Sequence, residues 1–232
     1  MLGAAKKSIN EIGERLKKQA LFMASIVGFL WVIEIVDSLA PFDFESLGIR
    51  PRQFLGLVGI LFAPFLHDGV GHLAGNSIGL FFFGWIILLG GTQSFLRVTA
   101  LIAVIAGMGT WLFGASRSIH IGASGIVFGY MAFLLLRGFF EKSLRWVMVA
   151  LIVAFVIYGF VDLGFNSTAE NNNGAVNISW SGHLSGFAGG IIAAWIFYYR
   201  PRNSPYAQTQ ITRKPAPSPV VSAILAWFSK RH

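Results

Sequence analysis

Residues 122–140 read GASGIVFGYMAFLLLRGFF, an apolar run of helix length that opens on a serine flanked by glycines. Its length and its low charge indicate a membrane-spanning helix over 124–140. The run is short for a span, so it crosses a bilayer only if Ser124 lies below the outer surface. A hydroxyl does not help a helix dissolve in lipid, so Ser124 is either a helix cap or a functional residue.

The composition of the whole chain also indicates a membrane protein. Of its 232 residues 55% are hydrophobic and 12% are charged, whereas a soluble domain carries about 25% charged residues. The chain has no cysteine, which excludes disulfides, thiolate metal sites and a cysteine nucleophile. The net charge of +8 does not indicate nucleic acid as a partner, because the basic residues lie in the tails and short connections, as membrane topology requires.

Six stretches are long enough to cross a bilayer, which takes about 20 mostly apolar residues. We predict spans at 21–40, 69–90, 95–114, 124–140, 145–165 and 180–199. A further apolar run at 54–65 is too short and ends near Pro64, so we expect it to be interfacial or re-entrant.

The distribution of lysine and arginine orients these spans. With a cytoplasmic N-terminus, fifteen of the eighteen basic residues lie on the cytoplasmic side, and only Arg50, Arg52 and Arg117 lie outside. Such a positive-inside bias predicts that the N- and C-termini are both cytoplasmic.

Three regions follow from this topology. Residues 1–20 form a basic cytoplasmic segment, residues 21–200 the six-span domain, and residues 201–232 a Pro/Ser-rich cytoplasmic tail that we expect to be disordered. Within the first region three apolar residues follow helical spacing: Ile9, Ile12 and Leu16. This spacing is compatible with an amphipathic helix at the membrane surface, and a solubilising tail is the alternative.

Polar residues gather at one predicted depth of the membrane. The second, fourth and sixth spans all run from outside to inside, so their outer ends carry His72 and Asn76, Ser124, and His183. Each residue alone has a structural explanation: a cap, a solvated histidine or an interhelical hydrogen bond. Four such residues from three spans at one level indicate a functional site.

Small residues predict that the fourth and sixth spans meet. Gly125 and Gly129 are four residues apart, and Gly182, Gly186 and Gly190 form a ridge beside His183. Glycine at every fourth position lets membrane helices approach closely. A serine needs such an approach for its short side chain to reach an imidazole.

Three motifs together resemble those of the rhomboid intramembrane serine proteases. Gly122-Ala123-Ser124-Gly125 with Gly129 is similar to G-x-S-G-x-x-x-G, and His183 with Gly186 and Gly190 is similar to H-x-x-G-x-x-x-G. His67, His72 and Asn76 resemble the second-span pattern H-x-x-x-x-H-x-x-x-N. The resemblance covers about residues 21–200, with the motifs in the family's order.

The resemblance implies a role for each motif residue. Ser124 would be the nucleophile, and His183 its general base and then the general acid. His72, Asn76 and the backbone N–H of Ser124 would stabilise the oxyanion, which suits a helix start with its unpaired N–H groups. Phe128 stands where the family often has tyrosine and would stack on the imidazole. The first loop lacks the Trp-Arg pair of some members, and two further histidines lie outside the motifs: His120 and His232.

The implied function is hydrolysis of a peptide bond in or near the outer end of a substrate's transmembrane helix. The implied fold is an all-α bundle of six transmembrane helices in a bacterial plasma membrane. Transmembrane protein substrates and the lipid bilayer would be its partners, and neither cofactor nor metal is expected. A non-catalytic rhomboid-like protein that binds membrane clients is one alternative, although it would be expected to lose the serine or the histidine. A transporter or channel whose histidines bind metal or relay protons is another. Carboxylates that would assist such histidines are nearly absent from the spans, since Glu34 and Asp37 lie on the first span only.

Overall fold

The computed structural model describes residues 2–140, 148, 151–152 and 180–199. The described residues form helices joined by turns, with one isolated bridge between Ile49 and His120, so the expected all-α fold is confirmed. The α-helices are α1 (Leu2–Leu39), α2 (Gly59–Phe62), α3 (Gly69–Leu88), α4 (Thr92–Phe113), α5 (Ser124–Phe140) and α7 (Trp180–Ala194). Short helices of other types are η1 (Phe44–Leu47), η2 (Phe54–Leu57), η3 (Ala63–Phe65) and the π-helical η4 (Trp195–Tyr199).

Several apolar helices make the protein a multi-pass membrane protein. Within the described ranges, three helices are long and apolar enough to span a bilayer, in α1, α3 and α4, and α5 is a shorter apolar helix. The predicted starts at 69, 124 and 180 coincide with the starts of α3, α5 and α7. The predicted fifth span, 145–165, and the tail, 201–232, lie mostly or wholly outside the described residues. The count of six spans and the side of each terminus therefore stay predictions.

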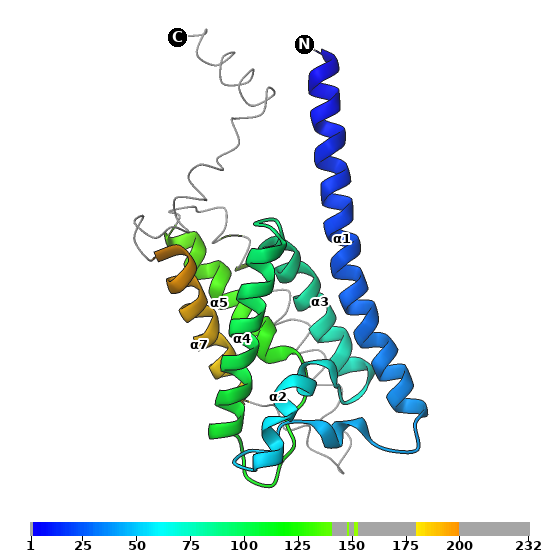
Figure 1. Ribbon diagram of the computed structural model, residues 1–232, viewed down its shortest axis with the longest axis vertical. Coiled ribbons are helices and arrows are strands. Elements are labelled where there is room, and N and C mark those ends of the chain that lie inside the picture. The colour runs from blue at the N-terminus through cyan, green and yellow to red at the C-terminus, as the bar shows by residue number, and fades with distance from the viewer. Residues whose placement is uncertain (1, 141–147, 149–150, 153–179, 200–232) are drawn as a thin grey trace. The chain divides into compact units, whose positions relative to one another are not determined.

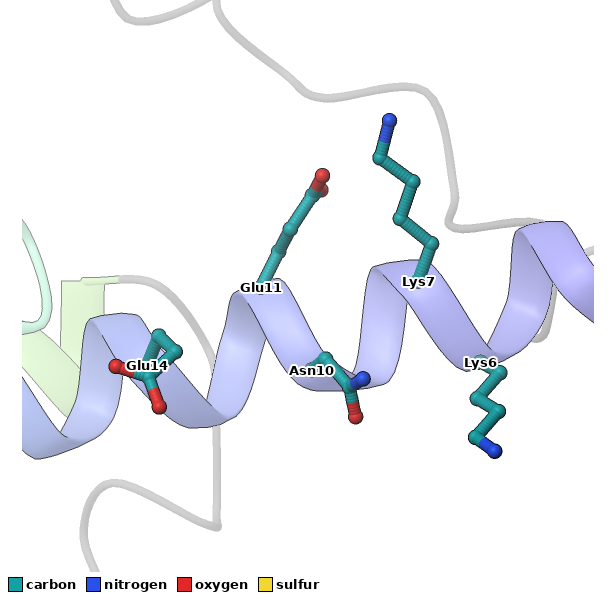
Figure 2. A pocket seen from close by; sticks show the side chains of 5 residues that line it. All are labelled: Lys6, Lys7, Asn10, Glu11 and Glu14. Atoms are coloured by element: carbon teal, nitrogen blue, oxygen red, sulfur yellow. The ribbon is translucent and has the colours of Figure 1, made fainter.

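Helix α1 extends to both sides of residue 21, where we predict that the first span begins. It runs without a break from Leu2 to Leu39, because the lysine, arginine and glutamate residues that precede the apolar part are good helix formers. Figure 2 shows its polar side chains one helical turn apart on shared sides, Lys7 with Glu11 and Lys6 with Asn10. These residues and Glu14 line a shallow hollow on the helix surface, and no motif residue borders it.

Residues Phe22–Tyr199 form one compact unit, in which α7 packs against both α5 and α4, and α5 also packs against α3 (Figure 1). Phe83, Val98, Ile102 and Phe133 are completely buried in its core. Buried Tyr130 of α5 hydrogen-bonds Thr99 of α4 at 2.6 Å. The core therefore holds together the helices that carry the sequence motifs.

The first loop, residues 41–66, is a set of short helical pieces rather than a span. The run 54–65 is divided among η2, α2 and η3, with Pro64 in η3, and it is too short to be one of the helices that could span a bilayer. Ile60 packs against Gly107 of α4, where a Cβ would collide with it. Phe54 and Leu55 are 84% and 77% exposed, so this loop joins the bundle on one side and presents apolar side chains on the other.

Candidate active site

Ser124 is the first residue of α5. The carbonyl of Ala123, the residue directly before the helix, accepts hydrogen bonds from Ile126 at 2.9 Å and Val127 at 3.1 Å. Gly122 has φ +101°, a conformation that glycine adopts without strain, and its N–H donates to the carbonyl of Ala63 at 2.8 Å. The chain thus enters the helix through a tight, anchored turn. The first N–H groups of α5 have no carbonyl one turn earlier to bond.

Ser124 and His183 lie within hydrogen-bond distance across two helices. Ser124 Oγ and His183 Nε2 are 2.8 Å apart, and both residues are half-buried. His183 lies in the first turn of α7, and its ring is stacked on Phe128 of α5 with centroids 4.3 Å apart and planes 13° apart. Trp180 contacts the same imidazole edge-on at 6.1 Å. A hydroxyl held against a ring nitrogen in this way can lose its proton to that nitrogen as it attacks a carbon atom.

The close approach of α5 and α7 depends on glycine from both helices. A Cβ on Gly186 would collide with the carbonyl oxygen of Gly125, and one on Gly190 with that of Gly129. In the other direction, a Cβ on Gly129 would lie 2.8 Å from the carbonyl oxygen of Gly186. A side chain at any of these positions would separate the helices, because the obstacle is backbone, which cannot rotate away.

His72 and Asn76 of α3 lie against the turn that precedes Ser124. An ideal Cβ on Gly122 would be 2.8 Å from His72 Nε2 and 3.5 Å from Asn76 Nδ2. Asn76 is 6% exposed, and its Nδ2 has no hydrogen-bond partner among the described residues. His72 Nδ1 accepts a long hydrogen bond of 3.4 Å from the N–H of Asp68, which in the neutral ring leaves the proton on Nε2. Two N–H donors therefore converge beside Ser124.

His67, the first residue of the second-span motif, lies behind His72. Its ring is 2% exposed and contacts that of His72 edge-on, with centroids 5.2 Å apart. Burial, and after it the neighbouring His72, lowers the pKa of His67 to about 3. The ring is therefore neutral at physiological pH and supports His72 by packing rather than by charge.

A small cavity of about 40 Å³ adjoins Ser124, with Thr110, His120, Gly122 and Gly182 among its lining residues. This volume suffices for a water molecule, which needs roughly 10–15 Å³. His120 is 7% exposed and its Nε2 lies 2.8 Å from Ser118 Oγ. Burial lowers the pKa of His120. Sequence reasoning left this histidine outside the site, because only its tertiary bridge to Ile49 brings it there.

The site contains no cluster of metal ligands within the described part of the chain. One group of three carboxylates does converge elsewhere, Asp37, Asp43 and Glu45. Two of the three already accept backbone hydrogen bonds, Asp37 from Phe44 at 2.9 Å and Asp43 from Glu45 at 2.7 Å. Burial, and then four neighbouring carboxylates, raises the pKa of Glu45 to about 7.

Comparisons with known proteins connect this geometry to one family. The family profile described as the Rhomboid domain matches residues 55–200. An uncharacterized protein of Mycobacterium tuberculosis is 39% identical over 177 residues, which cover 74% of this chain and 72% of that protein. RHOMBOID-like protein 4 of Arabidopsis thaliana is 31% identical over 159 residues, 64% of this chain and 38% of that protein. Rhomboid protease GluP of Bacillus subtilis is 30% identical over 132 residues, 56% of this chain and 24% of that protein.

Proposed function

The chain belongs to the rhomboid family, and from that premise we propose that it is an intramembrane serine endopeptidase with a Ser124–His183 dyad. The observation that carries the proposal is the 2.8 Å distance between Ser124 Oγ and His183 Nε2. A non-catalytic relative has no need to hold these two atoms together. Within the described residues no carboxylate hydrogen-bonds His183, and the stacked ring of Phe128 supplies the orientation that a third polar residue gives in a triad.

The proposed reaction begins with Ser124. Its Oγ attacks the carbonyl carbon of the scissile bond and gives its proton to His183 Nε2, as in other serine hydrolases. The C–N bond then breaks, and the leaving amine takes that proton from the imidazolium. In the second half, water attacks the acyl-enzyme, gives a proton to His183, and releases the new carboxyl group as Ser124 regains its hydrogen.

Negative charge develops on the substrate carbonyl oxygen during both halves. The N–H of Ser124, the Nε2–H of His72 and the amide of Asn76 are the donors that we assign to it. A helix N-terminus favours negative charge through its unpaired N–H groups and its dipole. The amide of Asn76 is buried without a partner, so it is available to a charge that is present only during the reaction.

The proposed substrates are transmembrane proteins, cleaved in or near the outer end of a helix. The dyad lies at the N-terminal ends of α5 and α7, which the charge distribution predicts to be the outer ends. The reaction as written uses only groups of the protein itself and water. A bacterial plasma membrane, with both termini in the cytoplasm, is the location that we propose.

A serine-reactive fluorophosphonate probe tests the proposed function. Purified wild-type protein should be labelled, and the Ser124→Ala variant should not. Ser25→Ala is the matched control, because this serine lies exposed on α1 and bonds only the carbonyl of Phe22. Labelling that persists in Ser124→Ala would reject Ser124 as the nucleophile, and a wild-type protein that is not labelled would favour the non-catalytic alternative.

A further inference from the structure

Hydrogen bonds join the first loop, residues 41–66, to the end of α4 and to the connection of residues 114–123 that leads from α4 to Ser124. At the start of the connection, Arg52 N–H donates to the carbonyl of Trp111 at 3.0 Å, and Trp111 Nε1 donates to the carbonyl of Gln53 at 2.8 Å. In its middle, Ile49 and His120 exchange two backbone hydrogen bonds of 2.9 Å each. Loop and connection are therefore held together well before the nucleophile is reached.

The end of the connection is bonded to the same loop. Gly122 donates to Ala63 at 2.8 Å, two residues before the nucleophile. Nothing in this set of contacts comes from α5 itself. The position of Ser124 relative to the rest of the bundle thus depends on the loop as well as on the helix.

The guanidinium group of Arg52 is the long side chain that bridges the two segments. Its NH1 donates to the carbonyl of Leu112 at 2.9 Å, and its NH2 donates to Ser116 Oγ at 2.6 Å. Leu112 belongs to the last turn of α4, whose carbonyls have no partner further along the helix, and a cation is favourable there. Arg52 therefore binds both the end of α4 and the connection just beyond it, with the backbone at φ +58°.

Close packing next to Arg52 couples the position of the loop to that of the connection. A Cβ on Gly114 would lie 2.7 Å from Pro51 Cγ and 2.8 Å from His120 Nε2. Pro51, Gly114 and His120 thus leave no room for a side chain between loop and connection. A shift of the loop at Arg52 would move His120, which precedes Ser124 by four residues.

We propose that Arg52 is a positioning residue for Ser124, acting through the end of α4 and the connection of residues 114–123. This inference rests on the proposed function. Arg52 does not reach the reacting atoms; it fixes the segment from which Ser124 projects. Lysine cannot replace it fully, because an ammonium group lacks the planar fork that donates to two separate acceptors at once.

The experiment compares Arg52→Ala with Arg50→Ala. Arg50 is two residues away in the same loop and carries the same charge, but its guanidinium bonds the carbonyl of Ser46 within the loop. The readouts are the rate of fluorophosphonate labelling per folded molecule, and kcat and KM with a transmembrane substrate in liposomes. We expect Arg52→Ala to lower labelling and kcat by about 10-fold or more with little change in KM, since a misplacement of about 1 Å costs about 10²-fold in rate.

Arg52→Lys should recover part of the lost rate, and Arg50→Ala should match the wild type. Ser116→Ala, which removes one acceptor only, should lower kcat by less, and adding it to Arg52→Ala should have no further effect. Normal kcat in Arg52→Ala, or equal losses in Arg52→Ala and Arg50→Ala, would overturn the inference. If Arg52→Ala does not accumulate, unchanged kcat in Ser116→Ala and Arg52→Lys overturns it instead. In each case labelling of the wild type at Ser124 keeps the proposed function intact, whereas its absence rejects that function first.

Discussion

Gly186 of α7 rests directly on the carbonyl oxygen of Gly125 in α5: no Cβ fits between them. Ser124 precedes Gly125 directly, and His183 lies three residues before Gly186. The hydrogen bond between them therefore depends on this contact between the two backbones. A change that lengthens the side chain at 186 should therefore act on the reaction without altering any reacting group.

We expect Gly186→Val to inactivate the enzyme, since a branched side chain facing a backbone carbonyl forces the helices apart. Ala188→Val is the control, because Ala188 is exposed on the same helix. Gly189→Val should be intermediate, since its Cβ would face Ile105 of α4 at 3.2 Å rather than α5. Cleavage per folded molecule in detergent measures the order, and equal losses in all three variants would contradict it.

Phe128 gives a second prediction. Its ring is stacked on His183, and aromatic pairs contribute roughly 0.5–1.5 kcal/mol beyond their buried area. Phe128→Ala should lower kcat about 10-fold by freeing the imidazole, since about 1.4 kcal/mol corresponds to a tenfold rate. Phe128→Tyr keeps the ring and should retain activity. Equal kcat values in the alanine and tyrosine variants would show that stacking does not orient His183.

A variant at Asn76 distinguishes a role of this residue in the reaction from a role in folding. Because its Nδ2 is buried without a hydrogen-bond partner, Asn76→Ala removes an unsatisfied donor and should leave Tm nearly unchanged. Loss of one oxyanion donor should lower kcat by about 10²-fold, with a smaller effect on KM. Tm and kcat are measured on one preparation. A clear fall in Tm with normal kcat would identify Asn76 as a structural hydrogen-bonding residue.

The raised pKa of Glu45 predicts that the stability of the protein depends on pH. This pKa is raised from 4.5 to about 7, so between these values the folded protein binds more protons than the unfolded chain, and stability falls as pH rises. Glu45→Gln should therefore raise Tm at pH 8 and weaken the decline between pH 4.5 and 7. The effect should be small, because the carboxyl group is largely solvated. Thermal unfolding over pH 4.5–8 measures it, and identical profiles for the two proteins would contradict it.

The helices that carry the motifs were predictable because local signals mark their starts. Gly122, two residues before Ser124, has a positive φ, and so does Gly69, the first residue of α3. Apolar length then fixes how far each helix runs. Helix α1 begins well before residue 21, the predicted start of the first span, because hydropathy indicates where a helix can enter the membrane and not where helical hydrogen bonding begins.

The first loop shows what sequence could not supply. Its length and Pro64 excluded a span, but the contacts of Arg52 with Leu112 and Ser116 join residues about sixty positions apart. No local spacing encodes such contacts. His120 enters the surroundings of Ser124 in the same way, through its bridge to Ile49.

The most direct test of the central claim is cleavage of a transmembrane substrate in liposomes by wild type, Ser124→Ala, His183→Ala and the double variant. Two residues that act as one unit give non-additive losses. We predict that each single variant loses essentially all cleavage while inserting normally, and that the double variant is no worse than either. Substantial cleavage by Ser124→Ala, or a double variant much less active than both single variants, would contradict a Ser124–His183 dyad.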